Sequence, residues 1–267
     1  MPRANRHFLP GRVWHLTHRC HQREFLLKFS RDRDTYLLWL YAARKRFGLC
    51  VLDYMVTSNH VHLLVKDTAE AIIARSVQLI AGRTAQAYNQ RKGRLGAFWE
   101  DRYHATAIET NAHLHRCLVY IDLNMVRAGA VSHPDQWSHS GYREVQQPPA
   151  RYRIIDLVAL SDACGFDDVE RFQRAHRNWV AAALDTRAAA REAHWSESIA
   201  VGGALFVEEV KRDLELKARH RQISEVDGHH MLREPEYPYE AHLDTKNVPL
   251  RMNNAVLWQS NSDFSEA

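Results

Sequence analysis

The sequence predicts an α+β protein with a βαββαβ order of elements, which is the order of ferredoxin-like and RRM-like folds. Two observations indicate this class. Strand-like and helix-like stretches alternate in that order along the first half of the chain, and a mostly helical stretch follows in the second half. Such a fold is an antiparallel sheet with helices on one face, so we expect the other face to be free for a ligand.

Residue composition, and the residues typical of helix ends, predict the first elements. Residues 12–20 are aromatic and β-branched without turn formers, which is typical of a strand. Residues 30–48 begin with a serine suited to an N-cap, repeat apolar side chains at helical spacing, and end at a glycine behind a Lys/Arg cluster. Residues 49–57 and 60–66 are two predicted strands around a Ser-Asn turn, which indicates a hairpin.

The first half continues with a second helix over 70–93, strand character over 96–109 and a third helix over 110–129. Turn formers are then dense up to residue 152, which marks a boundary. We therefore expect two parts, a domain over residues 1–148 and a helical C-terminal region over residues 149–267. Within the C-terminal region we expect helices over 167–195 and 204–221 and an irregular tail from residue 233.

Charge is distributed unevenly along the chain. The 267 residues carry a net charge of +4, whereas residues 1–149 hold 21 of the 36 Lys and Arg but only 12 of the 32 Asp and Glu. This cationic half also holds 11 of the 17 histidines. Its charge favours a polyanionic partner such as nucleic acid, although a solvated surface explains the same excess equally well.

Composition also argues against two classes of protein. No apolar run approaches the roughly 18 residues of a membrane span, and the first residues lack the apolar core of a signal peptide. The four cysteines are scattered without a CxxC pair, which indicates reduced packing residues rather than a disulfide framework. We therefore expect a cytoplasmic protein without a membrane partner.

The most informative short stretch is the histidine pair His60 and His62 on the second strand of the hairpin. Side chains two residues apart on a strand share a face, so the two imidazoles project together while Val61 points to the opposite side. Two imidazoles on one face can converge on one metal ion or one phosphate. The same spacing also arises by chance in a histidine-rich chain, so the pair alone does not establish a binding site.

The third helix supplies such groups on one face. Five polar side chains fall together at about 100° per residue, away from the apolar stripe: His113, Arg116, Tyr120, Asn124 and Arg127. Arginines beside a phenol can hold a phosphate and stabilise the phenolate, and an amide can give its carbonyl oxygen to a cation. The alternative is a solvated helix face whose tyrosine reaches the surface.

These motifs together resemble the single-tyrosine HUH nucleases, named for two histidines around a hydrophobic residue. They are most similar to the REP-associated tyrosine transposases, relatives of the IS200-like transposases. Four stretches carry the resemblance: MVTSNHVHLLV at 55–65, FWEDRYHATAIE at 98–109, YIDLNMVRAGAV at 120–131 and WSHSGY at 137–142. Their order and spacing look like that family's across roughly residues 8–145.

The resemblance implies that His60 and His62 bind a divalent metal, Mg²⁺ or Mn²⁺. It implies that Asn124 supplies a third ligand and that Tyr120 is the nucleophile. A site with two imidazoles suits Mn²⁺ at least as well as Mg²⁺, which prefers oxygen, and Zn²⁺ stays open. The family usually has proline after the asparagine, whereas this chain has Met125, so we expect the helix to continue there without a kink.

The function implied by the resemblance is cleavage and transfer of single-stranded or hairpin DNA through a 5′-phosphotyrosine intermediate. Repeated extragenic palindromic elements with a short conserved tetranucleotide beside the hairpin are the expected substrates, which implies a nucleoid-associated protein. Both a monomer and a homodimer are compatible with the family, because in some relatives the helix and the histidine pair come from different chains.

Basic and aromatic side chains of the first half are the candidates for DNA contact. They are Arg12, His15, Arg19, Arg44, Lys45, Arg46, Trp99, Arg102, Tyr103, Arg116 and Arg127. The FWEDRYH stretch interleaves aromatic and basic residues as single-strand platforms do, although Trp99 fits a core position equally well. The charges at 44–46 could instead offset the helix dipole. His15 and His21 share a strand face that excludes His18, so His15, His18, Cys20 and His21 cannot all converge on one zinc ion, which favours DNA contact or structural roles for them.

Two other function classes remain as alternatives. A non-catalytic single-stranded nucleic-acid-binding protein on an RRM-like sheet would not need the complete set of metal and nucleophile residues. A metal hydrolase that uses water would need clustered carboxylates near the histidine pair, and none are evident there. The C-terminal region, with its negative net charge, fits a packing or regulatory appendage better than an element that reads DNA.

Overall fold

The first half of the chain folds in the predicted order. The computed structural model describes residues 9, 11–186, 192–215, 221–226 and 228–233. The elements of the first half are β1 (Val13–Arg19), α1 (Ser30–Phe47), β2 (Cys50–Val56), β3 (His60–Lys66), α2 (Ile72–Lys92), β4 (His104–Ile108) and α3 (Ala112–Asp122). Strand β1 pairs antiparallel with β3 and β4, and β2 pairs antiparallel with β3. The α+β class is therefore confirmed, and β4 occupies only the last part of the stretch expected to be a strand.

Helix α1 illustrates how local sequence sets the ends of an element. Gly48 follows the helix with a φ of 71°, a left-handed conformation that glycine adopts without steric cost, and its N–H bonds the Arg44 carbonyl at 3.0 Å. The N-cap position is Phe29 rather than Ser30. The Ser30 hydroxyl instead donates to Asp34, 3.3 Å away within the first turn, so the predicted end is off by one residue.

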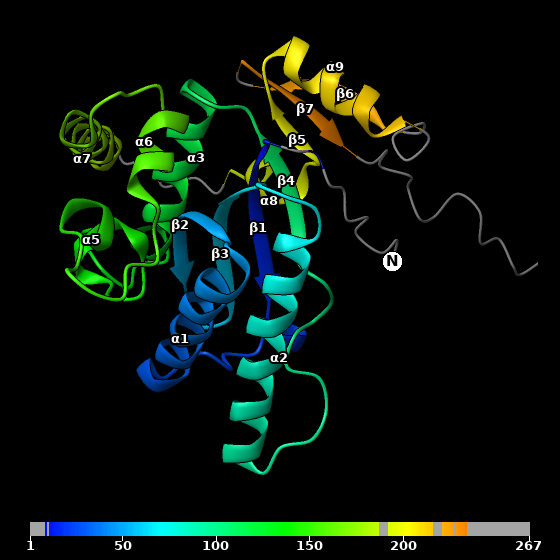
Figure 1. Cartoon of the computed structure of the whole chain (residues 1–267), viewed down its shortest axis with the longest axis vertical. Helices are drawn as coiled ribbons and strands as arrows, with labels where there is room; N and C mark the ends of the chain where they lie inside the picture. Colours follow the sequence, from blue (N-terminus) through cyan, green and yellow to red (C-terminus); the bar gives the residue numbers. More distant parts are fainter. Residues whose placement is uncertain (1–8, 10, 187–191, 216–220, 227, 234–267) are drawn as a thin grey trace, which may run out of the picture. The chain divides into compact units, whose positions relative to one another are not determined.

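Helices α1 and α2 pack against each other on one face of the sheet (Figure 1). Trp99 connects this face to both helices. Its ring stacks on His18 of β1 with centroids 4.0 Å apart, its indole N–H donates to the Ala81 carbonyl of α2 at 3.0 Å, and Tyr36 of α1 meets it edge-on. The two helices therefore lie on the side of β1 to which His18 points.

The opposite face of the sheet is also covered, so the expected free face is wrong. His15 and His62 point to this side, because they alternate with His18 and Val61 along their strands. Helix α3 packs there against β2 and β4, and the short helix α8 (His194–Glu197) contacts β1 and β4. The second half of the chain supplies α8, which sequence patterning of the first half could not anticipate.

The second half is a mixture of helices and strands rather than mostly helical. Two short helices, α4 (Asn124–Arg127) and α5 (Gly141–Gln146), complete the first half, and the elements of the second half are α6 (Leu157–Ala163), α7 (Val169–Asp185), α8, β5 (Ala200–Gly202), α9 (Ala204–Asp213), β6 (Gln222–Val226) and β7 (His229–Arg233). The helices expected over 167–195 and 204–221 correspond to α7 and α9, which are shorter. The three strands were missed, and the predicted tail lies outside the described residues apart from its first residue, Arg233.

These three strands extend the sheet of the first half. Among the described residues the sheet has seven strands in the order β2-β3-β1-β4-β5-β7-β6. Strand β5 pairs parallel with β4 through Ala107 and Ala200, and the remaining pairs are antiparallel. The division of the chain at residue 148 stays a prediction. Strands from both sides of that boundary belong to the same sheet.

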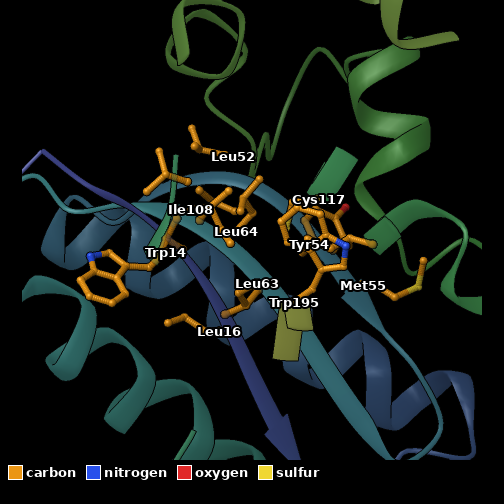
Figure 2. Close-up of a cluster of buried hydrophobic side chains, with 14 of the residues drawn as sticks. Trp14, Leu16, Leu52, Tyr54, Met55, Leu63, Leu64, Ile108, Cys117 and Trp195 are labelled. Carbon is orange, nitrogen blue, oxygen red and sulfur yellow. The ribbon is translucent and has the colours of Figure 1, made fainter. Parts of the chain in front are cut away.

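One large hydrophobic core joins the elements around the sheet, and a smaller separate cluster contains Leu123, Tyr142 and Val180. Figure 2 shows part of it, with Trp14 and Leu64 from the sheet, Cys117 from α3 and Trp195 from α8 among the labelled side chains. All four are 2% exposed or less. Helix α3 is thus held by its apolar stripe, and its polar face is free to line a site. None of the described helices is both long and apolar enough to cross a membrane.

Candidate active site

The histidine pair, Tyr120 and Asn124 line one pocket of about 350 Å³. The other lining residues are Thr17, Arg19, Arg23, Asn59, Arg127, Ala128 and Ser196. Strand register explains the wall formed by the sheet, because β1 places Thr17 opposite His62 and Arg19 opposite His60. The candidates from β3, α3 and α4 therefore meet within one chain, together with two of the arginines expected to contact DNA, Arg19 and Arg127.

His60 is oriented by the hairpin turn that precedes it. Its Nδ1 lies 2.7 Å from Asn59 Oδ1, while the Asn59 amide nitrogen donates to the Arg23 carbonyl at 3.3 Å. This assignment makes Nδ1 the protonated nitrogen of the His60 ring and Nε2 the nitrogen with the lone pair. Thr57 holds the turn by accepting from the His60 backbone N–H at 3.1 Å. The predicted Ser-Asn turn is confirmed.

His62 is almost completely buried and is held from two sides. Its Nδ1 lies 2.9 Å from His15 Nε2, and its Nε2 lies 3.1 Å from Asn124 Nδ2. Burial lowers the pKa of His62 well below its usual value, and nearby His60 and His15 lower it further. Burial also lowers the pKa of His15 to about 4. Both imidazoles are therefore neutral at physiological pH, as metal ligation requires of His62.

Tyr120 is 5% exposed and stands beside the histidine pair of its own chain. The centroid of its ring lies 6.0 Å from that of His62 and 6.4 Å from that of Trp195. The Arg127 guanidinium lies 4.3 Å from the ring centroid and donates to the Tyr120 carbonyl at 2.5 Å. A phenol beside two imidazoles and a guanidinium is an arrangement suited to nucleophilic attack on a phosphate.

Asn124 lies just after a break in the helix, contrary to the expected uninterrupted helix. Helix α3 ends at Asp122, Leu123 has a φ of −80° and a ψ of 4°, and α4 begins at Asn124. Met125 itself is compatible with a continuous helix. Tertiary contacts on both sides of the break override this propensity, because Asp122 is held by His176 and Asn124 by His62.

A second cavity of about 910 Å³ lies against the same helix, and Tyr120 and Arg127 line both cavities. Arg116 lines only this second cavity, where it donates to His229 Nε2 at 2.8 Å. His113, from the same predicted helix face, lies 2.9 Å from the other nitrogen of His229. The polar face of α3 is thus divided between two cavities rather than solvated.

The other predicted DNA contacts are dispersed. Arg12 is paired with Glu209 and Asp213 of α9, at 3.3 and 3.2 Å. Arg102 is exposed, and residues 44–46 lie at the end of α1 on the other face of the sheet.

Three candidates are packed into the fold. His15 is completely buried, which contradicts the expected DNA contact because no surface of its side chain is accessible. Tyr103 is 7% exposed, and the half-buried Trp99 packs on His18, which favours the core role for that tryptophan.

The family model described as "Transposase IS200 like" matches residues 12–124, the stretch that contains the histidine pair, Tyr120 and Asn124. Residues 12–124 belong to the IS200-like transposase family. Members of this family are HUH tyrosine endonucleases that act on DNA. No curated protein is significantly similar in sequence to the chain.

Two solved structures are similar to parts of this chain. One is a REP-associated tyrosine transposase bound to a REP hairpin, at 18% identity and a TM-score of 0.44, covering 57% of this chain and 90% of that one. The other is a candidate transposase from Deinococcus radiodurans, at 20% identity and a TM-score of 0.31, covering 38% of this chain and 82% of that one.

The family uses a divalent metal, and the donor set of this chain fits one. His60 and His62 both carry the proton on Nδ1, and His62 turns its Nε2 lone pair toward the Asn124 amide. Two neutral imidazoles and an amide suit a divalent cation of the Mg²⁺, Mn²⁺ or Zn²⁺ kind. Among the described residues no group of three or more His, Cys, Asp and Glu side chains could hold a metal, so the amide is needed.

Several functional candidates of this chain were missed by the sequence interpretation. Arg23 and Ser196 line the pocket, and the Trp195 carbonyl lies 2.7 Å from His15 Nδ1. Only Arg23 carried a signal, as a cation just after the first strand. Ser196 and Trp195 lie more than 130 residues beyond the histidine pair in the sequence. Only the tertiary fold brings them to the site, so no local pattern could indicate them.

Proposed function

We propose that this chain cuts and rejoins single-stranded or hairpin DNA, with Tyr120 as the nucleophile and a 5′-phosphotyrosine as the intermediate. One observation carries the proposal: the Tyr120 ring stands 6.0 Å from that of His62, in the same pocket as His60 and Asn124. Membership of residues 12–124 in a family of HUH tyrosine endonucleases supports these roles.

Three side chains would hold the divalent metal, Mg²⁺ or Mn²⁺: His60 and His62 through Nε2, and Asn124 through its amide oxygen once the amide, whose nitrogen here donates to His62 Nε2, has turned over. When bound, such an ion polarises a non-bridging oxygen of the scissile phosphate and orients that phosphate. The tautomers of both histidines support this assignment, because each ring has its lone pair on Nε2.

Tyr120 supplies the chemical step. Its phenolic oxygen gives up its proton and attacks the phosphorus in line, the bond from phosphorus to the 3′ oxygen breaks, and that oxygen takes up a proton to become a 3′-hydroxyl. The Arg127 guanidinium, 4.3 Å from the ring centroid, stabilises negative charge on the phenolic oxygen and the phosphate. The phosphotyrosine retains the energy of the broken bond, so a 3′-hydroxyl can attack it in reverse and rejoin the strand.

The pocket carries positively charged side chains, which favour binding of the negatively charged DNA backbone. Arg19 and Arg23 line it together with Arg127, and each guanidinium can bind a phosphate. We propose these three as the contacts next to the scissile phosphate. The exposed Arg102 and the basic residues 44–46 are proposed contacts for DNA that extends beyond the pocket. The motif resemblance supports repeated extragenic palindromic elements as the substrate class.

The fold supports this function in two ways. The order β2-β3-β1-β4, with three antiparallel pairs and with α1 and α2 on one face, supports a ferredoxin-like core for the nuclease. The nucleophile and the histidine pair come from one chain, which supports a monomer as the catalytic unit. Action on chromosomal DNA would make the protein nucleoid-associated in the cytoplasm.

The experiment is a search for the covalent intermediate. The protein is incubated with single-stranded hairpin oligonucleotides and Mn²⁺ or Mg²⁺, and a denaturing gel is used to detect a protein–DNA adduct. We expect an adduct that chelation abolishes and that Tyr120→Phe lacks. Tyr88→Phe, which alters a phenol on α2 at the other face of the sheet, is the matched control and should form the adduct normally.

His60→Ala and His62→Ala separate catalysis from binding. Each should lose cleavage while keeping most of its affinity for the hairpin, as measured by fluorescence anisotropy. Binding of hairpins without any adduct would favour the non-catalytic alternative. An undiminished adduct in Tyr120→Phe would refute the assignment of the nucleophile.

A further inference from the structure

Three polar contacts in a row connect the second half of the chain to the wall of the pocket. The Trp195 carbonyl lies 2.7 Å from His15 Nδ1, and His15 Nε2 lies 2.9 Å from His62 Nδ1. His62 Nε2 then lies 3.1 Å from the Asn124 amide nitrogen. The two imidazole planes are inclined by only 15°, as hydrogen bonding edge to edge requires, and both side chains are buried.

The direction of the protons along this path is set at the carbonyl end. A backbone carbonyl only accepts hydrogen bonds, so His15 must carry its proton on Nδ1. A neutral imidazole has one N–H, so His15 Nε2 is an acceptor. His62 must then donate its Nδ1–H to His15, which leaves the lone pair of His62 on Nε2, facing Asn124. One carbonyl in α8 thus determines the tautomer of a side chain on β3.

We propose that His15 is a positioning residue that holds His62 in its metal-binding tautomer and orientation, with the Trp195 carbonyl as its anchor. The role of His62 as a ligand rests on the proposed function above. A ligand histidine commonly donates its second N–H to a carboxylate or a carbonyl, which fixes the ring and raises its basicity. Here the His15 imidazole stands between His62 and the accepting carbonyl. That carbonyl belongs to Trp195, 133 positions beyond His62 in the sequence.

The two histidines of the pair therefore depend on different parts of the chain. His60 is oriented locally by Asn59, its neighbour in the hairpin turn. His62 is oriented by a segment of the second half. A change in that segment should disturb His62 and leave His60 as it is, so His60 is an internal reference for any measurement on His62.

The chain also offers a matched control for simple loss of packing. Thr106 of β4 pairs in register with His15 of β1 and is likewise completely buried. Its hydroxyl donates to the Ser198 carbonyl at 2.6 Å, which is a second contact between the sheet and the same segment. Thr106→Val removes that hydrogen bond with little change of volume and does not remove the acceptor for His62.

The first experiment reads the tautomer directly in protein without metal or DNA. Long-range ¹H–¹⁵N correlation spectra of the histidine rings should show His62 protonated on Nδ1. His15→Leu removes the acceptor and should give a mixture of His62 tautomers, whereas Thr106→Val should not. His15→Gln can place an amide oxygen near the position of Nε2 and should preserve the Nδ1–H tautomer. The His60 signals should be the same in all four proteins.

The second experiment measures Mn²⁺ binding by isothermal titration calorimetry, again without DNA. Loss of a partner of this kind typically weakens metal affinity about 10- to 100-fold, which is the effect we expect for His15→Leu. His15→Gln should retain most of the affinity, and Thr106→Val should bind as the wild type does.

Each outcome bears on a different claim. Protonation of His62 on Nε2 in the wild type, or a tautomer unchanged in His15→Leu, would overturn the positioning role, and the wild-type spectrum decides this even if a variant does not fold. Equal effects of Thr106→Val and His15→Leu would also overturn it, because packing alone would then explain them. The predicted tautomers in a protein that binds no Mn²⁺ would uphold the positioning and refute the metal site.

Discussion

His176 Nε2 lies 2.7 Å from Asp122 Oδ2, and both side chains are completely buried. The Gln146 amide donates to the other ring nitrogen of His176 at 3.0 Å, which directs the Nε2–H of the imidazole toward Asp122. This contact fastens α7 to α3 two residues beyond Tyr120. The helix that carries the proposed nucleophile is therefore held from the second half of the chain.

Removal of this contact should lower stability. His176→Leu leaves the buried carboxyl of Asp122 without its donor, so we expect the free energy of unfolding to fall by about 2–4 kcal/mol. Urea denaturation followed by circular dichroism measures the effect. Arg174→Ala, on the exposed side of the same helix, should change it by less than about 0.5 kcal/mol. Similar effects of the two variants would contradict this account.

Asp53 should make stability depend on pH. Burial raises the pKa of its carboxyl well above the usual value, and neighbouring Asp122 raises it further. A carboxyl with a raised pKa stabilises the fold fully below its unfolded pKa, near 4, and this contribution is lost as pH rises through the folded pKa.

Asp53→Asn lacks this titration, so its stability relative to the wild type should increase from pH 5 to pH 8. The expected slope is roughly 1 kcal/mol per pH unit while the folded carboxyl stays protonated. Urea denaturation at several pH values measures it. The exposed Asp185→Asn should show no such trend, and a difference independent of pH would refute the assignment to Asp53.

Two glycines should respond in opposite ways to alanine. A Cβ on Gly141, at the start of α5, would lie 1.9 Å from Asp53 Oδ1 and 2.9 Å from Ile155 Cδ1. Gly141→Ala should therefore lower the free energy of unfolding by about 1–3 kcal/mol. Gly82, within α2, has no atom within 4 Å of its added Cβ, so Gly82→Ala should raise it by about 0.5–1 kcal/mol. Thermal unfolding of both variants distinguishes these signs, and a stabilised Gly141→Ala would contradict the packing described.

Arg127 should act in the chemical step rather than in folding. Arg127→Leu removes the guanidinium beside the Tyr120 ring and should slow adduct formation roughly 100-fold at saturating DNA. Arg127→Lys keeps a charge but loses the planar fork, so its rate should be intermediate. Single-turnover gel assays measure these rates. Arg143→Leu, at an exposed position on α5, should react normally, and an Arg127→Leu rate within twofold of the wild type would exclude the role.

Local sequence was sufficient to predict the first half of the fold. The βαββαβ order followed from strand composition, helical periodicity and turn residues, all of which act over a few neighbouring positions. The His60 and His62 pair could be placed on one face for the same reason. Tyr120 and Asn124 could be linked to that pair by the motif resemblance, and the structure brings them to one pocket.

Elements defined by distant partners could not be predicted in this way. Strand β5 has three residues, too few for any periodicity, and exists as a strand because it pairs with β4 and β7. His15 looked like a cation suited to DNA contact, since nothing local reveals that α8 covers it. The break at Leu123 likewise depends on contacts with other elements rather than on Met125.

The parallel pairing of Ala107 with Ala200 has a consequence for biosynthesis. A ribosome that has made the histidine pair and Tyr120 has not yet made the strand beside β4 or the carbonyl that binds His15. The nascent chain therefore holds all the proposed reactive groups well before it holds the parts that arrange them. Under the proposed function a chain without its second half lacks the anchor of His62, so we expect cutting of DNA only after the second half has left the exit tunnel.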